Sequence, residues 1–238
     1  MECQTAKSIE DILRLALRIT SEDERRNVRP GVLRDKLNQC DWLSDQEKKS
    51  LSVELDCVEN QLKKDKFYPN LGNALDAFLE LREFPKIVIV GTDPYPDGRA
   101  TGIPFSVPDD YTGQCPNSLK TLNRVFGFER GVRSEWVKWM NDNHVLLLNR
   151  ALTSTVRAKS FELWDGFVKK CLSQIVNKVA VVWLLGHKAT QLKRHIEQFA
   201  EGSPDVFSSC HPSYVHCVGQ DCECYKCFAK VWKRIELS

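Results

Sequence analysis

Four short apolar runs constrain the fold of this 238-residue chain more than any other feature. Each run is continuous rather than alternating, which is typical of strands that are covered on both faces. Amphipathic segments that read as helices separate the runs, and strands alternating with helices indicate a parallel α/β sheet. The runs are KIVIV (86–90), HVLLL (144–148), VAVVWLL (179–185) and DVFSS (205–209). We therefore expect an α/β fold with a central four-stranded parallel sheet and helices on both faces.

The first 85 residues contain no such run and read as helices. Ser44 and Glu47 have the spacing of a capping box at the start of an amphipathic segment. An earlier apolar segment, IEDILRLALRI (9–19), is separated from it by the charged stretch SEDERRNVRPG (21–31). We therefore expect an N-terminal helical extension over residues 1–40 and one α/β domain over residues 41–238.

Charge and hydropathy exclude few classes of protein. The formal net charge of +2 neither requires nor excludes nucleic acid, so a DNA site would depend on the local placement of Lys and Arg. No apolar stretch approaches the roughly 20 residues that span a bilayer. The segment from Met1 to Thr20 lacks the layout of a signal peptide. We expect an intracellular protein without a membrane partner.

A polar residue follows each apolar run. In open parallel sheets the ligand crevice lies beyond the carboxyl ends of the strands, so these side chains should face one cleft. One such residue is usually only a turn former, but four in succession favour a site. The residues are Asp93, Asn149, His187 and His211.

The residue types narrow the chemistry of that cleft. The chain has no G-x-S-x-G elbow, no phosphate-binding G-x-x-x-x-G-K-[ST] and no G-x-G-x-x-G. An asparagine beside an aromatic residue suits recognition of a flat heterocycle, because a carboxamide donates and accepts in one plane.

The motifs GTDPYP, GIPFSV, LLLN, LLGH and HPS, in this order and spacing, closely resemble the family 1 uracil-DNA glycosylases from about Trp42 onward. The segments DPYPDGRATGIPF and KSFELWD are most similar to the divergent poxvirus-type branch. The resemblance implies a monofunctional DNA N-glycosylase that flips deoxyuridine out of DNA and hydrolyses its N-glycosidic bond. It implies base excision repair, an abasic product and no cofactor.

The resemblance also implies a role for each residue of the reaction. Asp93, ionised, stabilises the positive sugar and orients the attacking water, and His211 donates a hydrogen bond to uracil O2. Phe105 stacks on the flipped uracil, although core packing would be its ordinary role. Asn149 pairs with N3–H and O4 of uracil and thereby rejects cytosine. Tyr95 lies against C5 and excludes the methyl group of thymine.

DNA contacts are expected from short loops that match the family's phosphate-binding positions. Val215 stands where the family has its wedge leucine, and as a shorter side chain it should hold the opened duplex less firmly. Ser118 has an alternative role as the N-cap of the next helix. The expected DNA-binding residues are Ser118, Gly186, His187, Pro212, Ser213 and Val215.

Several residues depart from the family pattern. Thr92 replaces the usual glutamine, whose contact with uracil is largely through the backbone. Pro96 and Phe161 stand where histidines are common, Arg150 follows the key asparagine, and LTSTVR (152–157) is longer than usual. Activity is still expected, because Asp93, Asn149 and His211 are all present.

Ten cysteines in a long chain without an export signal are expected to be reduced. Five of them lie between Cys210 and Cys227. A zinc site is an alternative there, but C-x-C-x-x-C is a less usual zinc spacing than paired C-x-x-C, so we expect free thiols and no metal. The metal-ligand candidates are Cys217, Cys222, Cys224 and Cys227.

Two other functions compete with the glycosylase. The first is a DNA-binding or processivity partner of a replication polymerase that retains a glycosylase fold, with residues 1–40 as the place for a partner. The second is a glycosylase for other bases, which Tyr95 disfavours. The expected protein is a monomer that acts on uracil in single- or double-stranded DNA, in the nucleus or wherever DNA is replicated.

Overall fold

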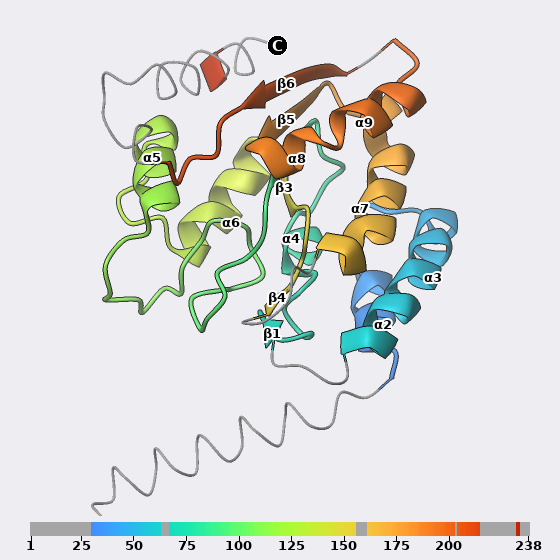
Figure 1. The fold of residues 1–238 in the computed structure, drawn as a ribbon, viewed down its shortest axis with the longest axis horizontal. Helices are drawn as coiled ribbons and strands as arrows, with labels where there is room; N and C mark the ends of the chain where they lie inside the picture. The colour runs from blue at the N-terminus through green and yellow to red at the C-terminus, as the bar shows by residue number, and fades with distance from the viewer. Residues whose placement is uncertain (1–29, 63–66, 156–160, 203, 215–231, 234–238) are drawn as a thin grey trace, which may run out of the picture.

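The computed structural model describes residues 30–62, 67–155, 161–202, 204–214 and 232–233. Its centre is the expected four-stranded parallel sheet, in the order β3-β2-β5-β6 (Figure 1). The strands are β2 (Ile87–Gly91), β3 (Val145–Asn149), β5 (Val181–Leu185) and β6 (Asp205–Ser209). Every residue of β2, β3 and β5 is buried, whereas the edge strand β6 is partly exposed. The prediction of strands covered on both faces is thus confirmed for three of the four.

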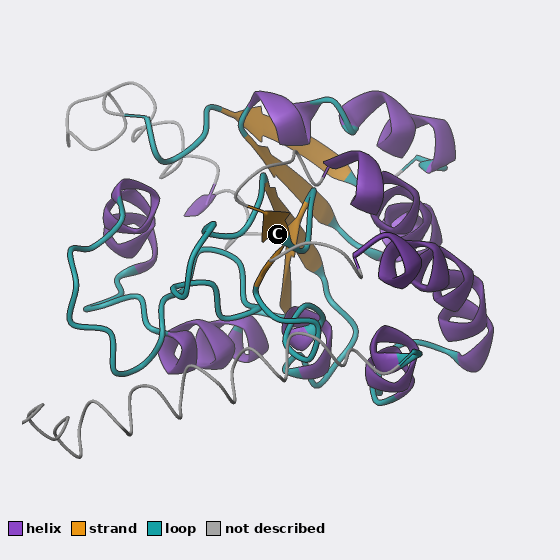
Figure 2. Ribbon diagram, turned by 60° about the horizontal axis from the view of Figure 1, so that its bottom comes forward, coloured by secondary structure: helices purple, strands orange, loops and turns teal. Residues whose placement is uncertain are grey.

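Helices lie on both sides of the sheet (Figures 1 and 2). One group comprises α2 (Val32–Asn38), α3 (Asp45–Leu62) and α7 (Phe161–Ile175), and α3 packs against both of the others. The other side carries α5 (Asn117–Phe126) and α6 (Arg133–Asp142). The remaining helices are α4 (Asp76–Leu79), the 3-10 turn η1 (Val176–Lys178), α8 (His187–Thr190) and α9 (Lys193–Phe199).

The capping box at the start of α3 is present. The side chain of Glu47 accepts the backbone N–H of Ser44 at 2.8 Å, and the Ser44 hydroxyl accepts the backbone N–H of Glu47 at 3.4 Å. These two bonds satisfy donors that the first turn of a helix leaves without partners.

The described part of the expected N-terminal extension packs into the domain. Leu33 and Leu37 of α2 are fully buried, together with Cys40. The carboxylate of Glu59 on α3 accepts the backbone N–H of Gly31 at 2.6 Å. Residues 30–40 therefore belong to the same hydrophobic core as the sheet. The domain boundary at residue 40 stays a prediction, and the helix predicted over residues 9–19 lies outside the described residues.

A second, two-stranded sheet was not predicted. It pairs β1 (Phe67–Tyr68) with β4 (Ser154–Thr155) in antiparallel fashion. Strands of two residues carry no hydrophobic periodicity that a sequence pattern could reveal. Within the described ranges, no helix has both the length and the apolar character that crossing a membrane requires.

Candidate active site

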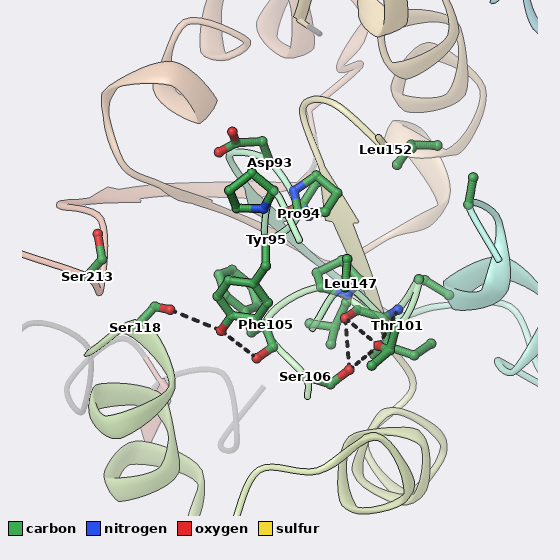
Figure 3. Close-up of a pocket in the computed structure, with 18 of the residues that line it drawn as sticks. Asp93, Pro94, Tyr95, Thr101, Phe105, Ser106, Ser118, Leu147, Leu152 and Ser213 are labelled. Atoms are coloured by element: carbon green, nitrogen blue, oxygen red, sulfur yellow. Dashed lines mark hydrogen bonds between the residues drawn. The ribbon is translucent and has the colours of Figure 1, made fainter. Parts of the chain in front are cut away.

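A pocket of about 230 Å³ lies at the carboxyl edge of the sheet (Figure 3). It contains Asp93 from the end of β2, Asn149 from the end of β3 and His211 after β6, as the sequence predicted. His187, the fourth polar residue of that prediction, is not among the described residues that line it. The other expected site residues that line the pocket are Tyr95, Phe105, Ser118 and Ser213.

Gly91, opposite Asn149 in the register of β2 and β3, allows two site residues to approach the strand end. A Cβ atom at Gly91 would lie 2.4 Å from Oδ1 of Asn149 and 2.7 Å from Cζ of Phe105. Only glycine permits so close an approach. Asn149 is 3% exposed, so its amide is held at the edge of the pocket with little contact with solvent.

Phe105 adopts an unusual backbone conformation, with φ of +69°. A bulky residue in this region is strained, and such strain persists only where the surroundings hold it. Hydroxyl groups brace the turn that precedes it: Thr101 accepts the backbone N–H of Ile103 at 3.2 Å, and Ser106 donates to the carbonyl of Ile103 at 3.0 Å. The ring lines the pocket and packs toward Trp136, with centroids 6.1 Å apart.

Tyr95 forms part of the pocket wall and is anchored at its hydroxyl end. The hydroxyl donates to the carbonyl oxygen of Phe105 at 3.0 Å and lies 3.4 Å from Oγ of Ser118 (Figure 3). Burial raises the pKa of Tyr95 to about 12, so the phenol stays neutral. Pro94 and Pro96 on either side restrict the backbone. The Tyr95 ring therefore forms a rigid part of the pocket wall.

Asp93 lies at the mouth of the pocket, where it is exposed to solvent. Figure 3 shows its carboxylate on the side of the pocket away from Ser106. Desolvation by the surrounding protein raises the pKa of this carboxyl. A raised pKa at a cleft residue is typical of a functional group.

His211 has a defined tautomer because of Ser213. The backbone N–H of Ser213 donates to Nδ1 of His211 at 3.2 Å, and the Ser213 hydroxyl lies 2.7 Å from the same nitrogen. A ring nitrogen that accepts an N–H carries no proton, so the proton of the neutral imidazole is on Nε2. Burial lowers the pKa of His211 to about 4, which keeps the ring neutral at ordinary pH.

The loop that carries His211 is fixed by contacts from two other elements. Thr121 of α5 donates its hydroxyl to the carbonyl of Pro212 at 3.0 Å. A Cβ atom at Gly186, whose φ is +91°, would lie 2.8 Å from Cβ of His211. Gly186 and Pro212 therefore support the histidine, and neither is among the residues that line the pocket.

Ser118 is the second residue of α5 and is only 5% exposed. The N-cap of that helix is Pro116, so the alternative role of Ser118 as the N-cap is wrong. The helix begins at Asn117, two residues before the start that a cap at Ser118 would give, so Ser118 lies inside its first turn. Its hydroxyl faces Tyr95 instead.

Other expected site residues lie elsewhere or outside the described residues. Thr92 does not line the pocket, and its carbonyl accepts the backbone N–H of Ala151 at 3.1 Å. Nε2 of His187 lies 3.3 Å from Nε2 of Gln191. Across the described ranges, no three His, Cys, Asp or Glu side chains are grouped as a metal site would need. Val215 and the candidate ligands Cys217, Cys222, Cys224 and Cys227 lie outside these ranges.

Sequence reasoning missed the residues that position the site. Arg150 connects the end of β3 to two helices: Nη1 donates to the carbonyl of Lys188 at 2.7 Å and Nη2 to Oδ1 of Asp165 at 3.1 Å. Thr101 and Ser106 brace the turn before Phe105. The sequence does hold one indication of this close packing, namely Gly91 of GTDPYP and Gly102 of GIPFSV. A glycine directly beside site residues indicates close packing or a positive φ.

The sequence of this chain is similar to one protein family and to several of its curated members. The model of the uracil DNA glycosylase superfamily matches residues 80–236. Uracil-DNA glycosylase 1 of Streptomyces avermitilis is 30% identical over 158 residues, which cover 62% of this chain and 67% of that protein. Uracil-DNA glycosylase of Mesomycoplasma hyopneumoniae is 34% identical over 171 residues, covering 66% of this chain and 73% of that protein.

Solved structures have the same fold. The crystal structure of mimivirus uracil-DNA glycosylase matches with a TM-score of 0.58 and 18% identity, over 89% of this chain and 77% of that chain. The crystal structure of UNG from Nitratifractor salsuginis matches with a TM-score of 0.57 and 17% identity, over 86% of this chain and 97% of that chain. At this level of identity the likeness concerns the fold alone.

Proposed function

The chain belongs to the uracil-DNA glycosylase superfamily, and on that premise we propose which side chains of its pocket carry out the reaction. The protein is a hydrolytic DNA N-glycosylase: it removes uracil from DNA and leaves an abasic site, the first step of base excision repair. The target nucleotide must leave the base stack to enter the pocket, at a cost of a few kcal/mol.

In our proposal Asn149 and Phe105 recognise the flipped base. The Asn149 carboxamide pairs with N3–H and O4 of uracil, and the Phe105 ring stacks on the base. Cytosine presents an acceptor and an amino group at the corresponding positions, so a fixed amide would be left with buried groups unpaired. The burial of Asn149 supports a fixed amide, and so does its packing against Gly91, which leaves no room for a Cβ atom there.

Discrimination against thymine is assigned to Tyr95. Its ring lies against C5 of uracil, where the methyl group of thymine would collide with it. The hydrogen bond from its hydroxyl to Phe105 supports this role, because a wall excludes a methyl group only if it cannot move aside.

Bond cleavage is assigned to Asp93 and His211. Breaking the C1′–N1 bond leaves positive charge on the sugar and negative charge on uracil. The Asp93 carboxylate stabilises the sugar cation and orients the water that attacks C1′. The Nε2–H of His211 donates to uracil O2 as negative charge develops there, and a neutral donor stores no charge in the ground state.

Contacts with the DNA backbone are assigned to the loop after β6 and to the first residues of α5 and α8. Ser213, which is exposed, offers its hydroxyl to a phosphate, and Ser118 with Gly186 and His187 completes the set. The proposal also extends to a protein partner of the replication machinery, bound through residues 1–40. The same reasoning implies that the protein works where DNA is replicated, in the nucleus or elsewhere in the cell.

The convergence of Asp93, Asn149, Phe105 and His211 on one pocket carries this proposal. The test is to incubate the purified protein, with EDTA, with an end-labelled single-stranded oligonucleotide that contains one uracil, and then to cleave abasic sites with alkali. We expect a product at uracil only, lost in Asp93→Asn and retained in Asp110→Asn, which alters an exposed acid outside the pocket. A product at thymine, or full activity in Asp93→Asn, would refute the assignment.

A further inference from the structure

The guanidinium group of Arg99 lies over the ring of Tyr95, with Cζ 5.1 Å from the ring centroid. A guanidinium in this position is attracted by the negative face of the aromatic ring. Pro96, three residues before Arg99, and Ala100, directly after it, both line the pocket. Arg99 itself is not among the described lining residues. Arg99 therefore contacts the pocket wall without contacting a base inside the pocket.

Asp97 fixes the position of this guanidinium. Nε and Nη2 of Arg99 donate to the two carboxylate oxygens of Asp97 at 2.9 and 2.7 Å, and the backbone N–H of Arg99 donates to Oδ1 at 3.0 Å. A two-pronged bond of this kind fixes orientation as well as distance. The hydrogen bonds lower the pKa of Asp97 and raise that of Arg99, so both groups are charged at ordinary pH.

Tyr95 is consequently held at two places. Its hydroxyl end is tied to the carbonyl of Phe105 at 3.0 Å, and its ring face is covered by Arg99. To admit a group at C5 of the base, the ring would have to turn or shift. Such a movement would break the hydrogen bond or draw the ring away from the guanidinium.

We propose that Arg99, held by Asp97, is a positioning residue that determines how strictly the pocket rejects uracils substituted at C5. This rests on the proposed function, in which Tyr95 is the wall beside C5. Arg99 acts on the base only through Tyr95, so its removal should relax selectivity while leaving uracil itself a good substrate.

The test compares the wild type with Arg99→Ala by competitive inhibition of uracil excision with free uracil and with free thymine. We expect Arg99→Ala to lower the inhibition constant of thymine relative to that of uracil by about two- to fivefold, as a partly exposed cation–π contact implies. The catalytic constant for uracil should change less than twofold. Arg99→Lys, which keeps the charge but not the fork, should restore part of the selectivity.

Asp97→Asn separates this role from a direct contact between Arg99 and a DNA phosphate. If Arg99 braces Tyr95, Asp97→Asn relaxes selectivity in the same direction as Arg99→Ala. If Arg99 binds a phosphate, removing the competing carboxylate tightens DNA binding, whereas Arg99→Ala weakens it, and selectivity stays unchanged in both. The second pattern would overturn the proposal.

Arg34→Ala provides the matched control. Arg34 also forms a partly exposed ion pair, with Asp56, on the helices α2 and α3. Its loss should change neither selectivity nor DNA affinity. If the wild type excises uracil but has the same selectivity as Arg99→Ala, the role of Arg99 is refuted and the proposed function stands. If the wild type neither excises nor binds uracil, the proposed function is refuted and this inference with it.

Discussion

The backbone N–H of Ser213 donates to Nδ1 of His211 across 3.2 Å. This bond comes from the main chain, so it does not depend on the serine side chain. It assigns the proton of the neutral ring to Nε2, the nitrogen that we propose donates to uracil O2. The conformation of a three-residue loop thereby determines which atom of the imidazole can act.

The two residues should consequently respond very differently to truncation. His211→Ala removes the donor to the developing anion and should lower the single-turnover rate about a hundred- to a thousandfold. Ser213→Ala keeps the backbone N–H, so its rate should fall less than about tenfold, with the larger effect on the Michaelis constant for DNA. Equal losses of rate in both variants would show that the hydroxyl, rather than the N–H, maintains the tautomer.

The pH dependence of excision should have an acid limb that belongs to Asp93. The reaction requires this carboxyl to be ionised, and burial raises its pKa, so activity falls as pH decreases through a value above the ordinary one. His211 must be neutral, and its pKa of about 4 keeps it so through pH 6.5, where histidines usually gain a proton. Profiles of kcat/KM should therefore show no limb near pH 6.5, and any effect of protonating His211 should appear only near pH 4. A limb near pH 6.5 that this variant removes would contradict the assignment.

Gly91→Ala should damage the site with little effect on the rest of the fold. The new Cβ would lie 2.4 Å from Oδ1 of Asn149 and 2.7 Å from Cζ of Phe105, so both must shift. A shift of this size at reacting groups costs about a hundredfold in rate. Gly98→Ala, in the turn after the same strand, meets no atom within 4 Å and serves as the control. Single-turnover rates on a uracil oligonucleotide measure the difference, and equal rates in the two variants would refute the close-packing argument.

The sheet and the central site residues were predictable because their signals are local. KIVIV and HVLLL are apolar throughout, and Asp93 and Asn149 come at or just after the ends of their strands. The positive φ of Phe105 was not predictable, because contacts with neighbouring segments determine it. The role of Arg99 likewise depends on how the turn folds back toward Tyr95.

Arg150 shows the same limit, because its three partners are 15 to 41 residues away in sequence. Its side chain is 14% exposed and bonds to the carbonyl of Lys188, to Oε1 of Gln191 and to Asp165. Arg150→Ala would leave these acceptors without their donor, which costs about 1–3 kcal/mol.

The melting temperature of Arg150→Ala should fall by about 2–4 °C for each kcal/mol lost. Lys138→Ala, which removes an exposed ion pair with Asp142, should have almost no effect. Because Arg150 directly follows Asn149 and bonds to the segment after β5, the Michaelis constant for DNA should rise more than kcat falls. Thermal unfolding and steady-state kinetics on the two variants test both parts. A melting temperature unchanged in Arg150→Ala would show that the three bonds contribute no net stability.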